Sequence, residues 1–119
     1  MIVSVPLREI AYARSGDKGS SANVGVIAYT KEGYSFLVSY LSSERVHHYF
    51  SPLGPTSTIR YELPNLWALN FVLRDILAGG ASRSLRIDAQ GKALGQAILE
   101  MEIELSDDLL KASVVPVKK

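Results

Sequence analysis

The chain has 119 residues, of which 47% are apolar, so we expect one domain spanning residues 1–119. Its 13 basic and 12 acidic residues nearly cancel, which argues against a nucleic-acid-binding protein. The absence of cysteine excludes disulfides, thiolate metal sites and a cysteine nucleophile. The apolar runs are shorter than a membrane span and the N-terminus lacks a signal-peptide pattern, so we expect a cytoplasmic protein.

The first half of the chain alternates strand and helix patterns. Apolar spacing predicts a strand at Leu7–Ala13, followed by a polar loop at Arg14–Asn23. Val24–Thr30 is apolar on both faces, which predicts a strand buried on both sides. Apolar residues at helical spacing predict helices at Glu32–Leu41 and Ser43–Phe50, with Ser43 as the N-cap of the second.

The second half begins with a clear alternation at Thr58–Leu63, where Ile59, Tyr61 and Leu63 share one face of a strand. Asn65–Ala78 reads as a helix capped by Asn65, and Ser84–Ile87 as a short strand. Ala97–Leu105 alternates apolar residues with glutamates, which predicts a strand, and the tail from residue 106 reads as irregular. Strands separated by helices predict an α+β fold, a ferredoxin-like two-layer sandwich whose antiparallel or mixed sheet carries helices on one face.

The segment A-R-S-G-D-K-G-S-S-A-N, residues 13–23, is a candidate anion site. Its glycines permit backbone angles that point N–H groups at one anion, and Arg14 and Lys18 add positive charge. The spacing of a phosphate-binding Walker loop is absent. The alternative is a structural hairpin loop in which Asp17 and Lys18 pair, and the residues alone leave the two readings open.

Two further segments carry polar residues beside glycine or apolar stripes. Asn70 falls next to the apolar stripe of its predicted helix, where it needs a backbone or ligand partner, although core packing explains most of that segment. Arg86 and Asp88 share one strand face, and they pair with each other unless Arg86 binds a ligand carboxylate. The adjacent His47 and His48 diverge on a helix, so we expect no metal site and no cofactor.

Three motifs, taken in order, resemble the C-terminal domain of the acyclic terpene utilisation (AtuA) family. They are A-R-S-G-D-K-G-x-x-A-N-x-G-V, Y-E-L-P-N-x-x-A-L-N-F and S-R-S-L-R-x-D-x-Q-G-K-x-x-G-Q, and the resemblance covers about Arg8 to Glu102. The resemblance implies a ferredoxin-like fold and a role in bacterial breakdown of acyclic terpenes or related branched acids, alongside acyl-CoA carboxylation enzymes. Because family members usually carry a large N-terminal domain, this chain resembles a stand-alone version of the small one.

These observations support two hypotheses of function. The first is a binding or regulatory subunit that works with a separate large AtuA-like partner or assembles with itself. The second is an enzyme component that binds an anionic substrate, an acyl-CoA phosphate or a carboxylate, through the loop at Arg14–Asn23. Because each motif carries glycine beside polar or charged residues and the elements between them resemble core, we also expect the three motifs to converge in space. The candidate ligand-binding residues are Arg14, Ser15, Gly16, Asp17, Lys18, Gly19, Asn23, Asn70, Arg86, Asp88 and Lys92.

The two apolar faces of Val24–Thr30 also predict self-association. Helices cover only one face of a small sheet, so the second face needs another source of apolar surface. A second copy of the chain is the simplest source, and two-fold pairing is the commonest arrangement. We therefore expect a homo-oligomer with its contact centred on Val24–Tyr29, away from the glutamates at Glu100–Glu104.

Overall fold

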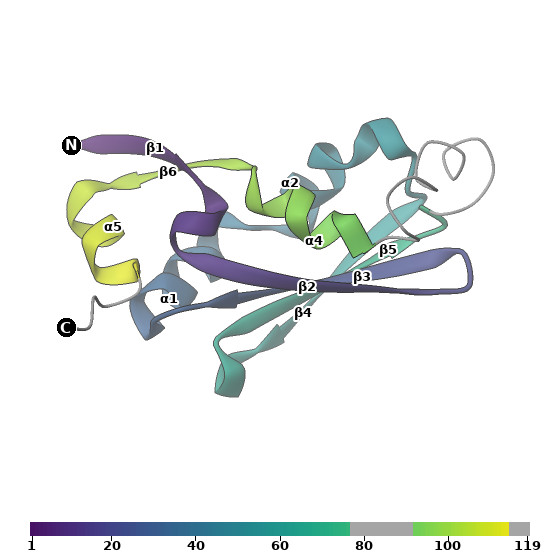
Figure 1. The fold of residues 1–119 in the computed structure, drawn as a ribbon, viewed down its shortest axis with the longest axis horizontal. Coiled ribbons are helices and arrows are strands. Elements are labelled where there is room, and N and C mark those ends of the chain that lie inside the picture. The colour runs from purple at the N-terminus through teal and green to yellow at the C-terminus, as the bar shows by residue number, and fades with distance from the viewer. Residues whose placement is uncertain (77–91, 115–119) are drawn as a thin grey trace.

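The computed structural model describes residues 1–76 and 92–114, together with their side chains except those of residues 17, 18, 92 and 93 (Figure 1). The predicted strand at Ser84–Ile87 lies wholly outside these residues, as do the last two residues of the predicted helix at Asn65–Ala78. No helix within the described part of the chain is long and apolar enough to cross a membrane.

A four-stranded antiparallel sheet forms the centre of the fold, in the order β2-β3-β5-β4. Its strands are β2 (Ala11–Lys18), β3 (Ser21–Ala28), β4 (Ser57–Leu63) and β5 (Ala68–Arg74). A separate antiparallel pair joins β1 (Ile2–Pro6) to β6 (Glu102–Ser106) near the two termini (Figure 1). The strands β3 and β4 flank β5 and are linked by helices, which is the split β-α-β arrangement of ferredoxin-like folds.

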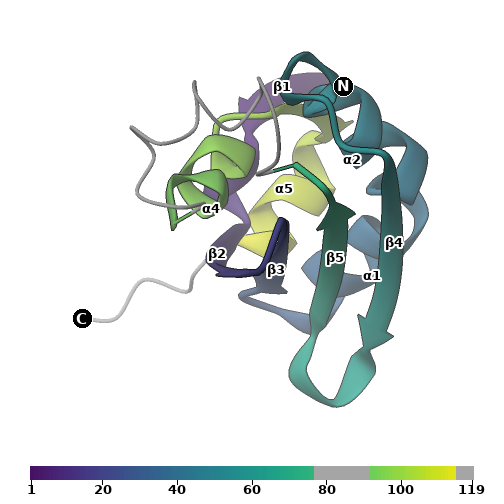
Figure 2. The same cartoon turned by 90° about the vertical axis from the view of Figure 1, so that its right-hand side faces the viewer.

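Within the described residues there are four α-helices: α1 (Lys31–Tyr40), α2 (Ser43–Tyr49), α4 (Lys92–Leu99) and α5 (Asp107–Ser113), the last of which packs against α1 and β6. Helix α4 packs against β2, α1 against β3 and α2 against β4 (Figure 2). Three 3₁₀ turns, Leu7–Glu9, Ser51–Leu53 and Pro64–Leu66, complete the described elements. The expected α+β fold, with an antiparallel sheet and packed helices, is confirmed.

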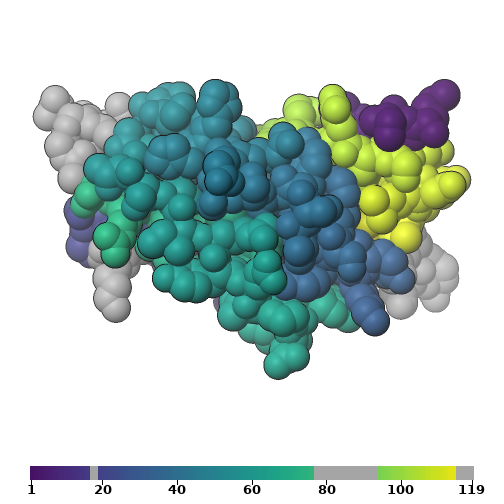
Figure 3. Space-filling view, turned by 180° about the vertical axis from the view of Figure 1, so that it is seen from behind, coloured from purple at the N-terminus to yellow at the C-terminus, as the bar shows by residue number. Residues whose placement is uncertain are grey.

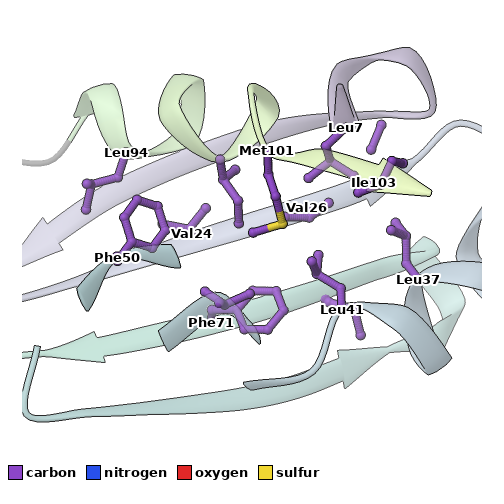
Figure 4. Close-up of a cluster of buried hydrophobic side chains, with 14 of the residues drawn as sticks. Leu7, Val24, Val26, Leu37, Leu41, Phe50, Phe71, Leu94, Met101 and Ile103 are labelled. Carbon is purple, nitrogen blue, oxygen red and sulfur yellow. The ribbon is translucent and has the colours of Figure 1, made fainter. Parts of the chain in front are cut away.

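The core lies between the helices and one face of the sheet. Val24 and Phe71 project from β3 and β5 toward Leu37 of α1 and Leu94 of α4, and each is at most 1% exposed (Figure 4). We call this side of the sheet the inner face. Because strand side chains alternate between faces, the residues between them form an outer face.

The expectation that Val24–Thr30 is buried on both faces holds for the inner face only. Val24, Val26 and Ala28 are at most 3% exposed, whereas Ile27 and Tyr29 on the other side are half-buried. The alternation in β4 is also confirmed, but its apolar row, Ile59, Tyr61 and Leu63, lies on the outer face. Arg60 lies on the helix side, where its Nη1 donates to the Val38 and Leu41 carbonyls at 2.9 and 3.1 Å and so satisfies the end of α1.

The predicted loop at Arg14–Asn23 is wrong, because these residues form the β2–β3 hairpin. Lys18 pairs with Ser21, which leaves a two-residue turn whose first residue, Gly19, has a φ of 62°. Glycine adopts this left-handed backbone without strain, and a Gly-Ser turn of two residues is a hairpin signal. The strand on the N-terminal side begins at Ala11 rather than Leu7.

The predicted helix at Asn65–Ala78 is also wrong, because Ala68–Arg74 is strand β5. Leu69 and Leu73 are four residues apart and fit a helix, but they also alternate with Phe71 to fit a strand. The strand wins because β5 lies between β3 and β4 and pairs with both. The short turn before it places Trp67 at a φ of 55°.

Three smaller differences concern element ends. The predicted strand at Ala97–Leu105 is shorter, since residues 97–99 end α4 and the strand begins at Glu102. Ser106 caps a final helix where an irregular tail was expected, by accepting from the Leu109 N–H at 3.1 Å. The N-cap of α2 is Ser42 rather than Ser43, because the Ser42 hydroxyl accepts from the Arg45 N–H.

Candidate functional site

The outer face brings together the first two motifs in one row of residues. Cross-strand pairing aligns Arg14 of β2, Gly25 of β3, Asn70 of β5 and Tyr61 of β4. One step along, a second row holds Tyr12, Ile27, Ala68 and Leu63. Residues far apart in the sequence therefore form a continuous surface across all four strands.

An amide pair lies at the centre of this surface. The Asn23 Nδ2 donates to the Asn70 Oδ1 at 3.3 Å. Two glycines leave space beside it: a Cβ at Gly16 would lie 3.4 Å from the Asn23 Oδ1, and one at Gly25 would lie 3.7 Å from the Asn70 Oδ1. Glycine in a strand often marks a place where a ligand or another backbone approaches closely.

A hollow of about 310 Å³ lies beside the amide pair, toward the β4–β5 turn. Its polar side has Arg14 and Asn70, and its apolar side is formed by Tyr12, Ile27, Leu63 and Leu66. Gly25 and Ala68, with little or no side chain, lie between these groups. Among the residues that the structure describes, Arg14 has no hydrogen-bond or ion-pair partner, so its guanidinium is available to a ligand.

A second hollow of about 490 Å³ lies on the other side of Asn70, toward the hairpin turn, and is lined by Ser21, Asn23, Val72, Arg74 and Asp75 among others. The Asp75 carboxylate accepts from the hydroxyls of Thr56 at 2.8 Å and Ser20 at 2.9 Å. These bonds, with the Thr56 hydroxyl contributing most, hold the pKa of Asp75 below its ordinary value. Asp75 thereby fastens the hairpin turn to the chain before β4.

Ser15 does not belong to the outer face. It lies on the inner side of β2, where its Oγ accepts from the Gly95 N–H of α4 at 3.1 Å. Gly95 belongs to the third motif, so the first and third motifs meet on the inner face, while the first and second meet on the outer face. Gly16 lies beside the amide pair, and Gly19 serves the turn.

Several candidate site residues lie wholly or in part outside the described residues. The side chains of Asp17, Lys18 and Lys92, and all of Arg86 and Asp88, lie outside the described residues. Convergence of all three motifs on one site therefore stays a prediction. The predicted backbone anion site at Arg14–Asn23 also stays a prediction. Residues 11–18 pair with residues 21–28 in a strand ladder, so the N–H groups that face the neighbouring strand bond to it.

Sequence reasoning missed Tyr12, Gly25, Leu66, Arg74 and Asp75 as parts of these hollows. Period-two alternation from Arg14 would have placed Tyr12 beside it, but no local signal pairs β3 with β5. The expectation that His47 and His48 form no metal site concerns a different surface, where the His47 Nδ1 lies 2.8 Å from the Thr58 Oγ1. Within the described ranges, no group of three or more histidines and carboxylates is placed to hold a metal ion.

Comparison with known proteins agrees with the motifs. The sequence matches the AtuA ferredoxin-like domain over residues 5–104, which includes the whole central sheet and both strands of the amide pair. No curated protein and no solved structure matches it. On the strength of a match across most of its length, the chain belongs to the AtuA ferredoxin-like domain family.

Proposed function

We propose that this chain is a binding subunit in the breakdown of acyclic terpenes or related branched acyl-CoA compounds, and that it docks through its outer face onto a separately encoded large AtuA-like protein. The observation that carries the proposal is the outer face itself, where two family motifs meet on a surface with little cover from the described residues. Family membership supports the pathway, and the residue types of the outer face support the docking surface.

The residue types of the outer face suit a protein interface. Tyr61 is 51% exposed, Leu66 is 64% exposed, and Trp67 beside them is 40% exposed. The β4–β5 turn that carries Leu66 and Trp67 protrudes from the body of the molecule (Figure 3). Exposed tyrosine, tryptophan and arginine are the residue types most enriched at the energetic centres of interfaces.

The charge of the surface supports a partner with a complementary surface. Its described strand rows contain Arg14 and Arg74 and no aspartate or glutamate. A partner surface that complements them presents a carboxylate opposite Arg14, surrounded by apolar residues that cover Tyr61 and Leu66. In two copies of this face, the described carboxylate beside the rows is Asp75, and it already accepts from Thr56 and Ser20. This favours a different protein as the stable partner.

Co-expression with a large AtuA-like protein tests the proposal. We expect the two chains to co-purify, and Arg14→Glu or Tyr61→Ser to abolish co-purification. Lys31→Glu, an equal charge change at an exposed position on α1, should leave it intact. Two outcomes would refute docking through this face: co-purification that is lost with Lys31→Glu but kept with Arg14→Glu and Tyr61→Ser, or no association between the wild-type chains.

Binding of a small anion is the second candidate function, and it is favoured by the guanidinium of Arg14, which has no hydrogen-bond or ion-pair partner among the described residues. Side chains, rather than the strand backbone, would supply the contacts. Titration with inorganic phosphate and acetate distinguishes this function from docking, because neither needs a second protein.

A further inference from the structure

The structure assigns to the 310 Å³ hollow a site for a monocarboxylate with a short hydrocarbon tail, bound by Arg14 and Asn70 at one side and by the apolar residues of the β4–β5 turn at the other. This inference rests on the second candidate function, the binding of a small anion by Arg14, and is independent of docking, because it concerns a small molecule bound by the chain alone.

The polar side of the hollow matches a carboxylate. A guanidinium presents N–H groups in a fork that matches two carboxylate oxygens, and charge-assisted bonds of this kind are the stronger ones in proteins. The Oδ1 of Asn70 already accepts from Asn23, so its Nδ2 is the group left to donate to a ligand. The Asn23–Asn70 bond thus orients a second donor beside Arg14, and Asn23 acts as a positioning residue.

The apolar side of the hollow matches a hydrocarbon tail. Ile27 and Leu63 lie one row further along the strands than Arg14 and Asn70, and Leu66 adds a third apolar side chain from the turn. Between the polar and the apolar side lie Gly25 and Ala68, which have little or no side chain and leave the hollow open, whereas larger residues at these positions would fill it. A ligand that spans both sides must carry a charge at one end and an apolar group at the other.

The size and charge of the hollow favour a short monocarboxylate over a phosphate or a long ligand. Small-molecule pockets span ~300–1,000 Å³, so this hollow is at the small end and suits a short chain. Arg14 is the one cationic side chain among the described residues that line it. A phosphate dianion would gain a single guanidinium and face the apolar side chains of Ile27, Leu63 and Leu66, so we expect it to bind elsewhere or not at all.

The inference is tested by titrating the chain with octanoate, octanol, octylammonium and inorganic phosphate, followed by calorimetry and amide chemical shifts. We expect octanoate to bind, with shifts centred on residues 12, 25, 27, 63 and 70, and octanol and octylammonium to bind at least tenfold more weakly. Arg14→Gln should weaken octanoate binding about tenfold or more, since the loss of a charge-assisted bond of about 1.4 kcal/mol is tenfold.

Two further variants separate the site from general adhesion to an apolar surface. Gly25→Ala places a methyl group in the hollow at an ordinary 3.7 Å from the Asn70 Oδ1, so it should fold normally and weaken octanoate binding. Arg74→Gln removes the other outer-face arginine, which does not line this hollow, and should leave the affinity unchanged. Equal binding of octanol and octanoate, or equal loss with Arg14→Gln and Arg74→Gln, would overturn the assignment, whatever the outcome of the docking test.

Discussion

Substituting Gly95 with alanine should test how closely helix α4 must approach strand β2. A Cβ at Gly95 would lie 3.5 Å from the Ser15 Cβ, which is an ordinary contact, but only 3.1 Å from the Ser15 Oγ. At that distance the Ser15 hydroxyl or the helix must move by a few tenths of an ångström. The same hydroxyl accepts from the Gly95 N–H, so moving it away also weakens that bond. The new methyl group and the hydrogen bond therefore compete for one place.

The expected magnitude follows from three opposing effects. Overpacking a close contact destabilises by roughly 1–3 kcal/mol, and loss of the hydrogen bond adds about 1 kcal/mol. Replacing glycine by alanine within a helix stabilises by about 1 kcal/mol. The sum predicts that Gly95→Ala lowers the free energy of unfolding by about 1–3 kcal/mol, which is roughly 4–8 °C in Tm per kcal/mol for a domain of about 100 residues.

Thermal and urea unfolding, followed by circular dichroism, should be measured for Gly95→Ala, Ser15→Ala and the double variant. Because Ser15→Ala removes the oxygen that meets the new methyl group, Gly95→Ala should cost at least about 1 kcal/mol less in that background. Gly25→Ala is the matched control, since its Cβ meets nothing closer than 3.7 Å, and it should be neutral or slightly stabilising. An equal cost of Gly95→Ala with and without the Ser15 hydroxyl would refute the close-contact explanation.

Two further predictions concern pH and self-association. Because the pKa of Asp75 is lowered, its stabilising hydrogen bonds are fully present above the ordinary carboxyl pKa of 3.8 and are lost as the pH falls through the lower pKa of the folded state. Asp75→Asn should remove this part of the decrease of Tm at acid pH. An unchanged decrease of Tm at acid pH in the variant would contradict this prediction. In the absence of a partner protein, the chain should sediment at micromolar concentration as a two-fold dimer that pairs the outer side of Val24–Tyr29. Leu63→Ser with Leu66→Ser, which lie beside Ile27 on that side, should shift it to a monomer. Octanoate should also shift the dimer toward the monomer, because octanoate and the second copy of the chain would occupy the same hollow. A wild-type chain that sediments as a 13.0 kDa monomer would contradict self-pairing.

The sequence by itself determined several strands and helices of the fold and some of its polar site residues. The strands near Val24 and Ile59 and the two helices that follow β3 were predicted from their apolar spacing, since this pattern reflects which side chains must leave water. The motifs also identified Arg14, Asn23 and Asn70 as polar residues that needed partners. Family membership followed from the same motifs.

Local patterns could not decide the structure of two segments. The residues around Leu69 and Leu73 suit a helix and a strand equally, and only pairing with strands on both sides settles β5. The polar residues of the first motif read as a loop because no apolar alternation marks the β2 side of the hairpin. Its Gly19-Ser20 turn was the one local signal.

Only the tertiary structure decided which candidate residues lie together. In a strand, neighbouring side chains point to opposite faces, so a single step in register separates Arg14 on the outer face from Ser15 against α4. The bond from Asn23 to Asn70 joins residues 47 positions apart, and it exists because β3 pairs with β5 in one register. Strand pairing depends on the burial of the whole inner face at once, and for this reason no segment of the sequence specifies it alone.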